Sequence, residues 1–158
     1  MSDNFQTTRA LDDLVAAAGT EIGVSRWFAM PQSRVDGFAD VTEDWYFIHT
    51  NPARAADETP WGGTIAHGFL TLSLLSAMAY EVCPQVEGAS RGVNYGFDRI
   101  RFVSPVPVGS RVRGRFVLER ADTSRANEVT LTYGVTVEIE DAERPALAAQ
   151  WLTRQFWD

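Results

Sequence analysis

The chain has 158 residues, 45% of them hydrophobic, and a formal net charge of −7. This length and composition predict a single domain over residues 1–158 with a substantial core. The acidic balance argues against a nucleic-acid partner, because phosphate binding needs a basic face. All fourteen basic residues are Arg, which excludes Schiff-base chemistry and a Lys general base.

The cysteine count, the N-terminal segment and the longest apolar run bear on where in the cell the protein is expected. Cys83 is the one cysteine, so no disulfide can form within the chain. The segment 1–6 lacks the basic and apolar regions of a signal peptide. The apolar run 65–80 has sixteen residues, which is short for a membrane span. We expect a soluble cytoplasmic protein with no membrane partner.

The first half of the chain predicts short helices. A cap box, Ser33 followed by Asp36, marks the start of one of them. Residues 66–82 are apolar in nearly all directions, which is typical of a helix that protein surrounds on every side, and Pro84 ends it. The predicted elements are helix 11–18, strand 21–28, helix 33–42, an irregular connection 44–51, helix 52–57 and helix 66–82.

After Gly88 the apolar residues recur at every second position. Breaks at 105–109, 121–127 and 140–145 divide this region into about four strands, the last over 146–156. A buried helix followed by consecutive antiparallel strands predicts the α+β class, with the sheet curling around the helix.

Asp44 and His49 are the leading candidates for acid/base chemistry. On one continuous helix, residues five apart diverge by roughly 140°, so their cooperation requires a break in the chain between them. Imidazole titrates near neutrality, and a neighbouring carboxylate can orient it or share a water with it. The alternative is a capping Asp and a hydrogen-bonded structural His.

Gly68 begins the buried helix and follows the second histidine, His67. First-turn N–H groups lack internal partners, and a residue without a side chain lets a substrate oxygen approach closely. Gly68 is therefore a candidate oxyanion donor, and His67 a structural or orienting neighbour. Tight packing of the helix start is the alternative for Gly68.

Other chemistries have weaker support. Two histidines eighteen residues apart and one cysteine do not form a zinc spacing, so we expect no metal. A triad of Ser76, His49 and Asp44 can be drawn, but no sharp nucleophile turn surrounds a serine.

Five segments together resemble the MaoC-like (R)-specific enoyl-CoA hydratases, in particular the NodN-like branch. The similarity covers most of the chain from about Val35. The segments are Asp44-Trp-Tyr-Phe-Ile-His49, Gly62-Gly-Thr-Ile-Ala-His-Gly68 with Leu70-Thr-Leu-Ser-Leu-Leu75, Asn94-Tyr-Gly96, Arg99-Ile-Arg-Phe102 and Pro105-Val-Pro-Val-Gly109.

The resemblance implies a hot-dog fold, a long helix wrapped by an antiparallel sheet, and a homodimer with sites at the interface. It implies hydration of a trans-2-enoyl-CoA to an (R)-3-hydroxyacyl-CoA, or the reverse dehydration, with CoA as part of the substrate and no separate cofactor. Asp44 and His49 would activate the water, the Gly68 N–H would polarise the thioester carbonyl, and Ser76 and Asn94 would contact substrate.

One departure from the family concerns the substrate. Many hydratases carry Asn-Pro where this chain has Tyr46-Phe47, which we expect to reshape the acyl pocket. A hot-dog acyl-CoA thioesterase and a non-catalytic acyl-CoA-binding protein remain alternatives. The segment Arg91–Arg125 holds eight Arg against three acidic residues, so we expect it to meet the CoA phosphates. Solvated Arg on strand faces are the alternative.

Overall fold

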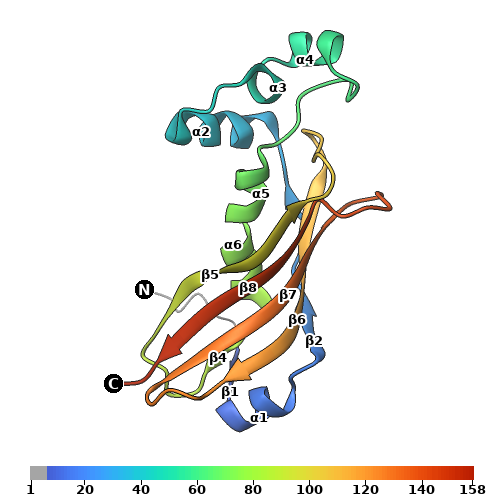
Figure 1. Ribbon diagram of the computed structural model, residues 1–158. Coiled ribbons are helices and arrows are strands. Elements are labelled where there is room, and N and C mark those ends of the chain that lie inside the picture. The colour runs from blue at the N-terminus through green and yellow to red at the C-terminus, as the bar shows by residue number, and fades with distance from the viewer. Residues whose placement is uncertain (1–6) are drawn as a thin grey trace.

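The computed structural model describes residues 7–158, and the segment 1–6, in which we expect no signal peptide, lies outside the described residues. A twisted antiparallel sheet packs against two consecutive helices, and three more helices project beyond one end of the sheet (Figure 1). The C-terminal end of β8 lies at the opposite end of the sheet. No helix within residues 7–158 is long and apolar enough to cross a membrane.

The main sheet has six strands in the order β2-β6-β7-β8-β5, and β3 pairs with β6 beside β2. All of its pairings are antiparallel. The short strands β1 (Thr8–Arg9) and β4 (Gln85–Val86) form a separate parallel pair. The six strands are β2 (Thr20–Val24), β3 (Phe28–Ala29), β5 (Arg91–Phe102), β6 (Arg111–Asp122), β7 (Glu128–Ile139) and β8 (Leu147–Phe156).

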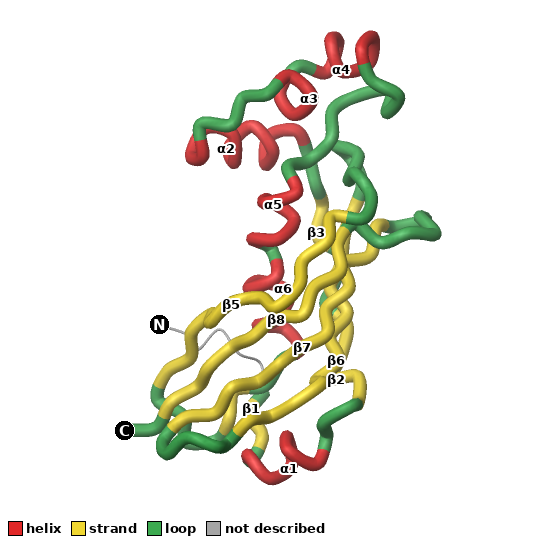
Figure 2. The backbone as a smooth tube through the Cα atoms, in the orientation of Figure 1, coloured by secondary structure: helices red, strands yellow, loops and turns green. Residues whose placement is uncertain are grey.

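Within residues 7–158, six helices accompany the sheet. Figure 2 shows α5 and α6 in line beside the strands, with α2, α3 and α4 beyond the sheet end. The helices are α1 (Leu11–Ala16), α2 (Gln32–Thr42), α3 (Phe47–Thr50), α4 (Pro52–Glu58), α5 (Gly68–Ser73) and α6 (Leu75–Val82).

The core lies between α5–α6 and the facing side of the sheet. Met78 of α6 and Phe116 of β6 are fully buried, and Tyr133 and Trp151 are nearly so. Gly114 makes room for this packing: a Cβ there would lie 2.7 Å from a Phe116 ring atom and 3.0 Å from the Met78 sulfur. The period-two pattern therefore reports one buried face of a half-exposed sheet, as the α+β layout predicts.

The predicted helix over 66–82 is wrong in two respects. Its start at Gly68 agrees with the predicted helix start, but the helix is interrupted at Leu74, which separates α5 from α6. It is also not enclosed on all sides within one chain, because Phe69 is 67% exposed. Apolar content alone does not distinguish protein contact within a chain from an apolar face left open.

Three other local predictions need correction. Strand 21–28 is two strands, because the chain leaves the sheet between β2 and β3. The cap box is wrong: Pro31 occupies the N-cap of α2 and no side chain caps it. The connection 44–51 is not irregular throughout, because the short helix α3 (Phe47–Thr50) lies within it.

Candidate active site

A cleft of about 360 Å³ lies where α5 begins, at the junction of the sheet with the projecting helices. Asp44, His49 and Gly68 all line it, and so does His67. Its remaining lining is largely apolar and includes Phe102 of β5. Of the five predicted site residues, the structure therefore brings three together and adds the second histidine.

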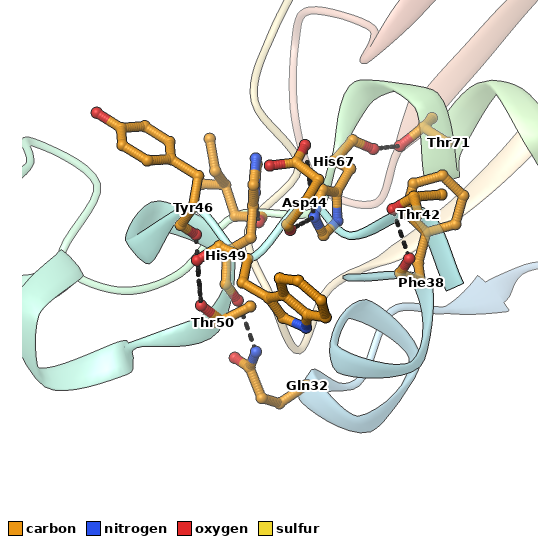
Figure 3. Close-up of polar contacts among 11 residues, drawn as sticks. Gln32, Phe38, Thr42, Asp44, Tyr46, His49, Thr50, His67 and Thr71 are labelled. Atoms are coloured by element: carbon orange, nitrogen blue, oxygen red, sulfur yellow. Dashed lines mark hydrogen bonds and ion pairs between the residues drawn. The ribbon is translucent and has the colours of Figure 1, made fainter. Parts of the chain in front are cut away.

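The chain break expected between Asp44 and His49 is present. Helix α2 ends at Thr42, and Glu43 adopts a left-handed conformation with φ of 62°. Helix α3 starts at Phe47, so Asp44 lies in the turn and His49 on the new helix. This reversal places both side chains at the cleft (Figure 3). The Asp44 side chain is 54% exposed, whereas His49 is 9% exposed.

The hydrogen bonding of His49 fixes its tautomer. Its Nδ1 lies 2.7 Å from the carbonyl oxygen of Ile65. A carbonyl can only accept, so Nδ1 carries the proton and Nε2 has a free lone pair. The Ile65 N–H in turn donates to the Ile48 carbonyl at 3.0 Å, which ties α3 to the same segment.

Burial is the largest influence on the charge of His49. Desolvation lowers its pKa from 6.5, and the bond to the Ile65 carbonyl opposes this decrease without reversing it. His49 is therefore neutral at neutral pH. A neutral imidazole with a free Nε2 can accept a proton.

His67 lies beside Asp44 and His49, in keeping with the structural or orienting role expected for it. It is 2% exposed, and its Nε2 donates to the backbone carbonyl of Asp44 at 2.9 Å. The same nitrogen lies 3.9 Å from the Asp44 carboxylate. Its ring stacks on that of His49, with centroids 3.8 Å apart and planes inclined by 28°. Its position before Gly68 was the only sequence signal.

Gln32 also supports the site, and sequence reasoning missed it. Its amide nitrogen donates to the carbonyl of His49 at 2.7 Å and to the Asp36 carboxylate at 2.8 Å. Its amide oxygen accepts from the Thr64 hydroxyl at 2.5 Å. Gln32 thus connects α2, α3 and the segment before α5. A single polar residue at a helix start carries no sequence signal for this role.

Gly68 combines both interpretations offered for it. A Cβ at this position would lie 2.9 Å from a ring carbon of Phe102, so close packing requires glycine. The residue also lies at the first position of α5, where backbone N–H groups lack helical partners. The absence of a side chain at Gly68 therefore allows both the close packing of Phe102 and access to the Gly68 N–H.

Ser76 and Asn94 lie elsewhere. They line a second cavity, of about 330 Å³, between α6 and β5. The Asn94 amide donates to the Ser76 hydroxyl at 3.3 Å. Ser76 is eight residues beyond Gly68, about 12 Å along a helix. The structure therefore does not assemble Ser76 with His49 and Asp44 as a triad within one chain.

Tyr46 and Phe47, which depart from the family pattern, do not line the cleft within one chain. Phe47 packs beneath Arg54, whose guanidinium carbon lies 3.9 Å from the ring centroid. Tyr46 contacts Phe47 edge-on and is 59% exposed. Tyr46 and Phe47 would therefore influence the shape of the cleft through the position of α3, which carries His49.

The side chains at the cleft are arranged poorly for a shared metal ion. Candidate ligand atoms of Asp44, His49 and His67 all lie within 4.8 Å of one another. Imidazole lone pairs lie in the ring plane and must converge about 2 Å from a zinc ion. Stacked rings direct their lone pairs side by side instead, and the His67 Nε2 already carries a proton. The arrangement of Asp44 and His49 therefore suits proton transfer better than metal binding.

The Arg-rich segment is mostly neutralised by its own sheet. Five of its eight Arg form ion pairs with described residues, and Arg99, Arg101 and Arg120 do not. The pairs are Arg91–Asp158, Arg111–Glu140, Arg113–Glu138, Arg115–Glu138, Arg115–Glu21 and Arg125–Glu128. The expectation that this segment meets the CoA phosphates stays a prediction, and it now concerns the Arg without ion pairs, because acidic side chains of the sheet and of residues near it pair with the others.

Comparison with known proteins places these residues in context. The family described as MaoC like domain matches the chain over residues 13–139. The chain is 54% identical over 144 residues to Nodulation protein N of Rhizobium leguminosarum bv. viciae, covering 91% of this chain and 89% of that protein. It is 42% identical over 150 residues to 3-hydroxyacyl-thioester dehydratase Z of Mycobacterium tuberculosis, covering 95% and 98%.

The fold has a close counterpart among solved structures. The (R)-hydratase from A. caviae involved in PHA biosynthesis superposes with a TM-score of 0.68 at 23% identity, over 86% of this chain and 94% of that one. This similarity confirms the predicted hot-dog fold.

Proposed function

The chain belongs to the MaoC-like dehydratase family, and on that premise we propose that it interconverts trans-2-enoyl-CoA and (R)-3-hydroxyacyl-CoA. Family membership supports the coarser statement, a hydratase or dehydratase. The relative named as a 3-hydroxyacyl-thioester dehydratase supports a thioester substrate.

The observation that carries the proposal is the free Nε2 of His49 in the same cleft as the Asp44 carboxylate. The Ile65 carbonyl holds the proton on Nδ1. Burial keeps the imidazole neutral by lowering its pKa. A neutral base beside an exposed carboxylate can bind one water and take its proton.

In hydration, the water oxygen attacks Cβ while His49 Nε2 takes its proton, and Asp44 holds the second hydrogen. Electron density moves to the thioester oxygen, where the Gly68 N–H accommodates the negative charge. The proton taken by His49 Nε2 then passes to Cα of the substrate, which completes the addition of one water. Dehydration follows the same steps in reverse.

We propose that the working form is a homodimer, on the evidence of strand β5. It is twelve residues long and pairs with β8 on one side only, among the described residues. Its exposed side chains include Val93 and Tyr95. Long unpaired apolar edges are rare in soluble monomers. Sedimentation as a monomer at micromolar concentration would contradict this.

The assay that tests the function measures loss of the enoyl absorbance of crotonyl-CoA. We expect Asp44→Asn and His49→Asn to lower kcat/KM by about 10²–10⁴-fold with the fold preserved. Full activity in either variant would refute the assignment.

The alternatives have different readouts in the same assay. Release of free CoA without loss of the enoyl absorbance would indicate a thioesterase. Calorimetric binding of acyl-CoA without turnover across enoyl-CoAs of graded length would indicate a binding protein. Chirality of the hydrated product distinguishes the (R)-specific reaction from its mirror image.

A further inference from the structure

We propose that His67 is a positioning residue that holds Asp44 and His49 in register: its N–H fixes the Asp44 backbone and its ring supports the His49 imidazole. The inference rests on the proposed function, in which Asp44 and His49 share the water. His67 would act through these two residues and not on the substrate itself.

The first contact is with the backbone of Asp44. Asp44 lies in the turn between α2 and α3, and its side chain is half-exposed. The His67 Nε2–H donates to the Asp44 carbonyl at 2.9 Å. This bond connects an exposed turn to a residue that is 2% exposed at the start of α5. The bond therefore restrains Asp44, the catalytic side chain candidate that the core does not bury.

The second contact is the stack on His49. With centroids 3.8 Å apart and planes 28° from parallel, the His67 ring covers one face of His49. That cover excludes water from the face and restrains the orientation of the His49 ring, whose plane contains the Nε2 lone pair. One residue therefore sets both the position of the carboxylate backbone and the environment of the base.

The remaining nitrogen of His67 shows that folding alone does not explain the residue. Nδ1 is buried and has no hydrogen-bond partner among the described residues. A buried polar atom without a partner destabilises a fold. A phenylalanine, although larger, would place an aromatic ring here without an unpaired nitrogen, so we infer that a histidine here serves the N–H bond to Asp44.

Few charged groups face the His67 ring. The turn after α2 presents the Asp44 carboxylate, at 3.9 Å, and α3 presents the His49 imidazole. Helix α2 presents the ring of Phe38, at 5.1 Å between centroids. Helix α5 presents the Thr71 hydroxyl, 3.5 Å from the His67 carbonyl. The relevant titrating groups are thus Asp44 and His49.

Two substitutions separate the two contacts. His67→Phe keeps a ring against His49 and removes the donor to Asp44. His67→Gln keeps an amide donor of similar reach and removes the ring. Phe38→Leu is the matched control, because it trims another ring that packs on His67 and leaves both contacts in place.

For His67→Phe we expect kcat/KM to fall at least tenfold, with the acid limb of the pH profile unchanged and Tm at or above the wild-type value. For His67→Gln we expect a smaller fall, with the acid limb moved to higher pH. Phe38→Leu should stay within twofold of wild type. Wild-type rates and profiles in both His67 variants, or losses that only follow a lowered Tm, would overturn the proposal.

A readout independent of activity is available because the chain has two histidines. In either His67 variant, the single remaining imidazole Hε1 signal in the NMR spectrum belongs to His49. Its titration should move to higher pH in His67→Gln and stay near the wild-type position in His67→Phe. An unmoved titration in His67→Gln would refute the ring contact even if the protein proved not to be a hydratase.

Discussion

The carbonyl oxygen of Ile65 accepts a hydrogen bond from Nδ1 of His49 at 2.7 Å, and this bond commits the proton of the imidazole to Nδ1. The free Nε2 follows directly from it. Ile65 precedes α5 by three residues, so the segment that delivers Gly68 to the cleft also sets the tautomer of the base.

The lowered pKa of His49 predicts how stability depends on pH. The unfolded chain binds a proton below pH 6.5, whereas the folded chain resists it until a lower pH. The stabilisation from His49 is therefore complete above 6.5 and is lost as pH falls from 6.5 through the folded pKa. Urea unfolding of wild type against His49→Asn should show the steeper decrease in wild type. Parallel curves would contradict the lowered pKa.

Gly68→Ala should reduce activity more than stability. The added methyl group would meet the Phe102 ring at 2.9 Å and stand beside the N–H proposed for the thioester oxygen. We expect kcat/KM to fall at least tenfold in the crotonyl-CoA assay, because an oxyanion donor contributes about 10²–10³-fold.

Gly37→Ala is the control for this substitution, because it lies in α2 and a Cβ there meets no atom within 4 Å. Replacing a helical glycine by alanine should stabilise the fold by about 0.5–1 kcal/mol and leave kcat/KM unchanged. Equal activity losses in the two variants would indicate a general effect of helix rigidity.

Gln32→Met should uncouple α2 from α3. Methionine has a similar length but leaves the His49 carbonyl and the Thr64 hydroxyl without their partner. We expect a loss of about 1–3 kcal/mol in the free energy of unfolding, because buried polar groups lose their bonds. Gln85→Met, which removes one bond to the Ala89 carbonyl, should cost less and leave kcat unchanged.

The unpaired Arg of β5 are the sharper candidates for CoA phosphates. Arg99→Ala with Arg101→Ala should raise KM for acyl-CoA at low salt, and the difference should shrink in 0.5 M salt, where the Debye length is about 4 Å. Arg113→Ala is the control, since Glu138 already occupies that guanidinium at 2.7 Å. Equal effects from both substitutions would indicate a role for net charge alone.

Much of the fold could be predicted from the sequence, because burial leaves a periodic mark. The alternation in β6, β7 and β8 survives over most of each strand, because one face of these strands lies on the core. In β5 two register shifts break the period, although the strand itself lies in the region predicted after Gly88. Pro52 lies in the first turn of α4 and agrees with the predicted helix start at residue 52. The Ser33–Asp36 spacing resembles a cap box, but no side chain caps α2.

The sequence by itself determined the family, the hot-dog fold and three residues of the cleft, since Asp44, His49 and Gly68 stand in short motifs whose spacing is local. Only the tertiary structure decided the rest. The stack of His67 on His49 and the bonds of Gln32 join separate segments, and their geometry depends on how α2, α3 and α5 meet. Contacts of that kind have no periodicity in one sequence, because each depends on packing that many side chains determine together.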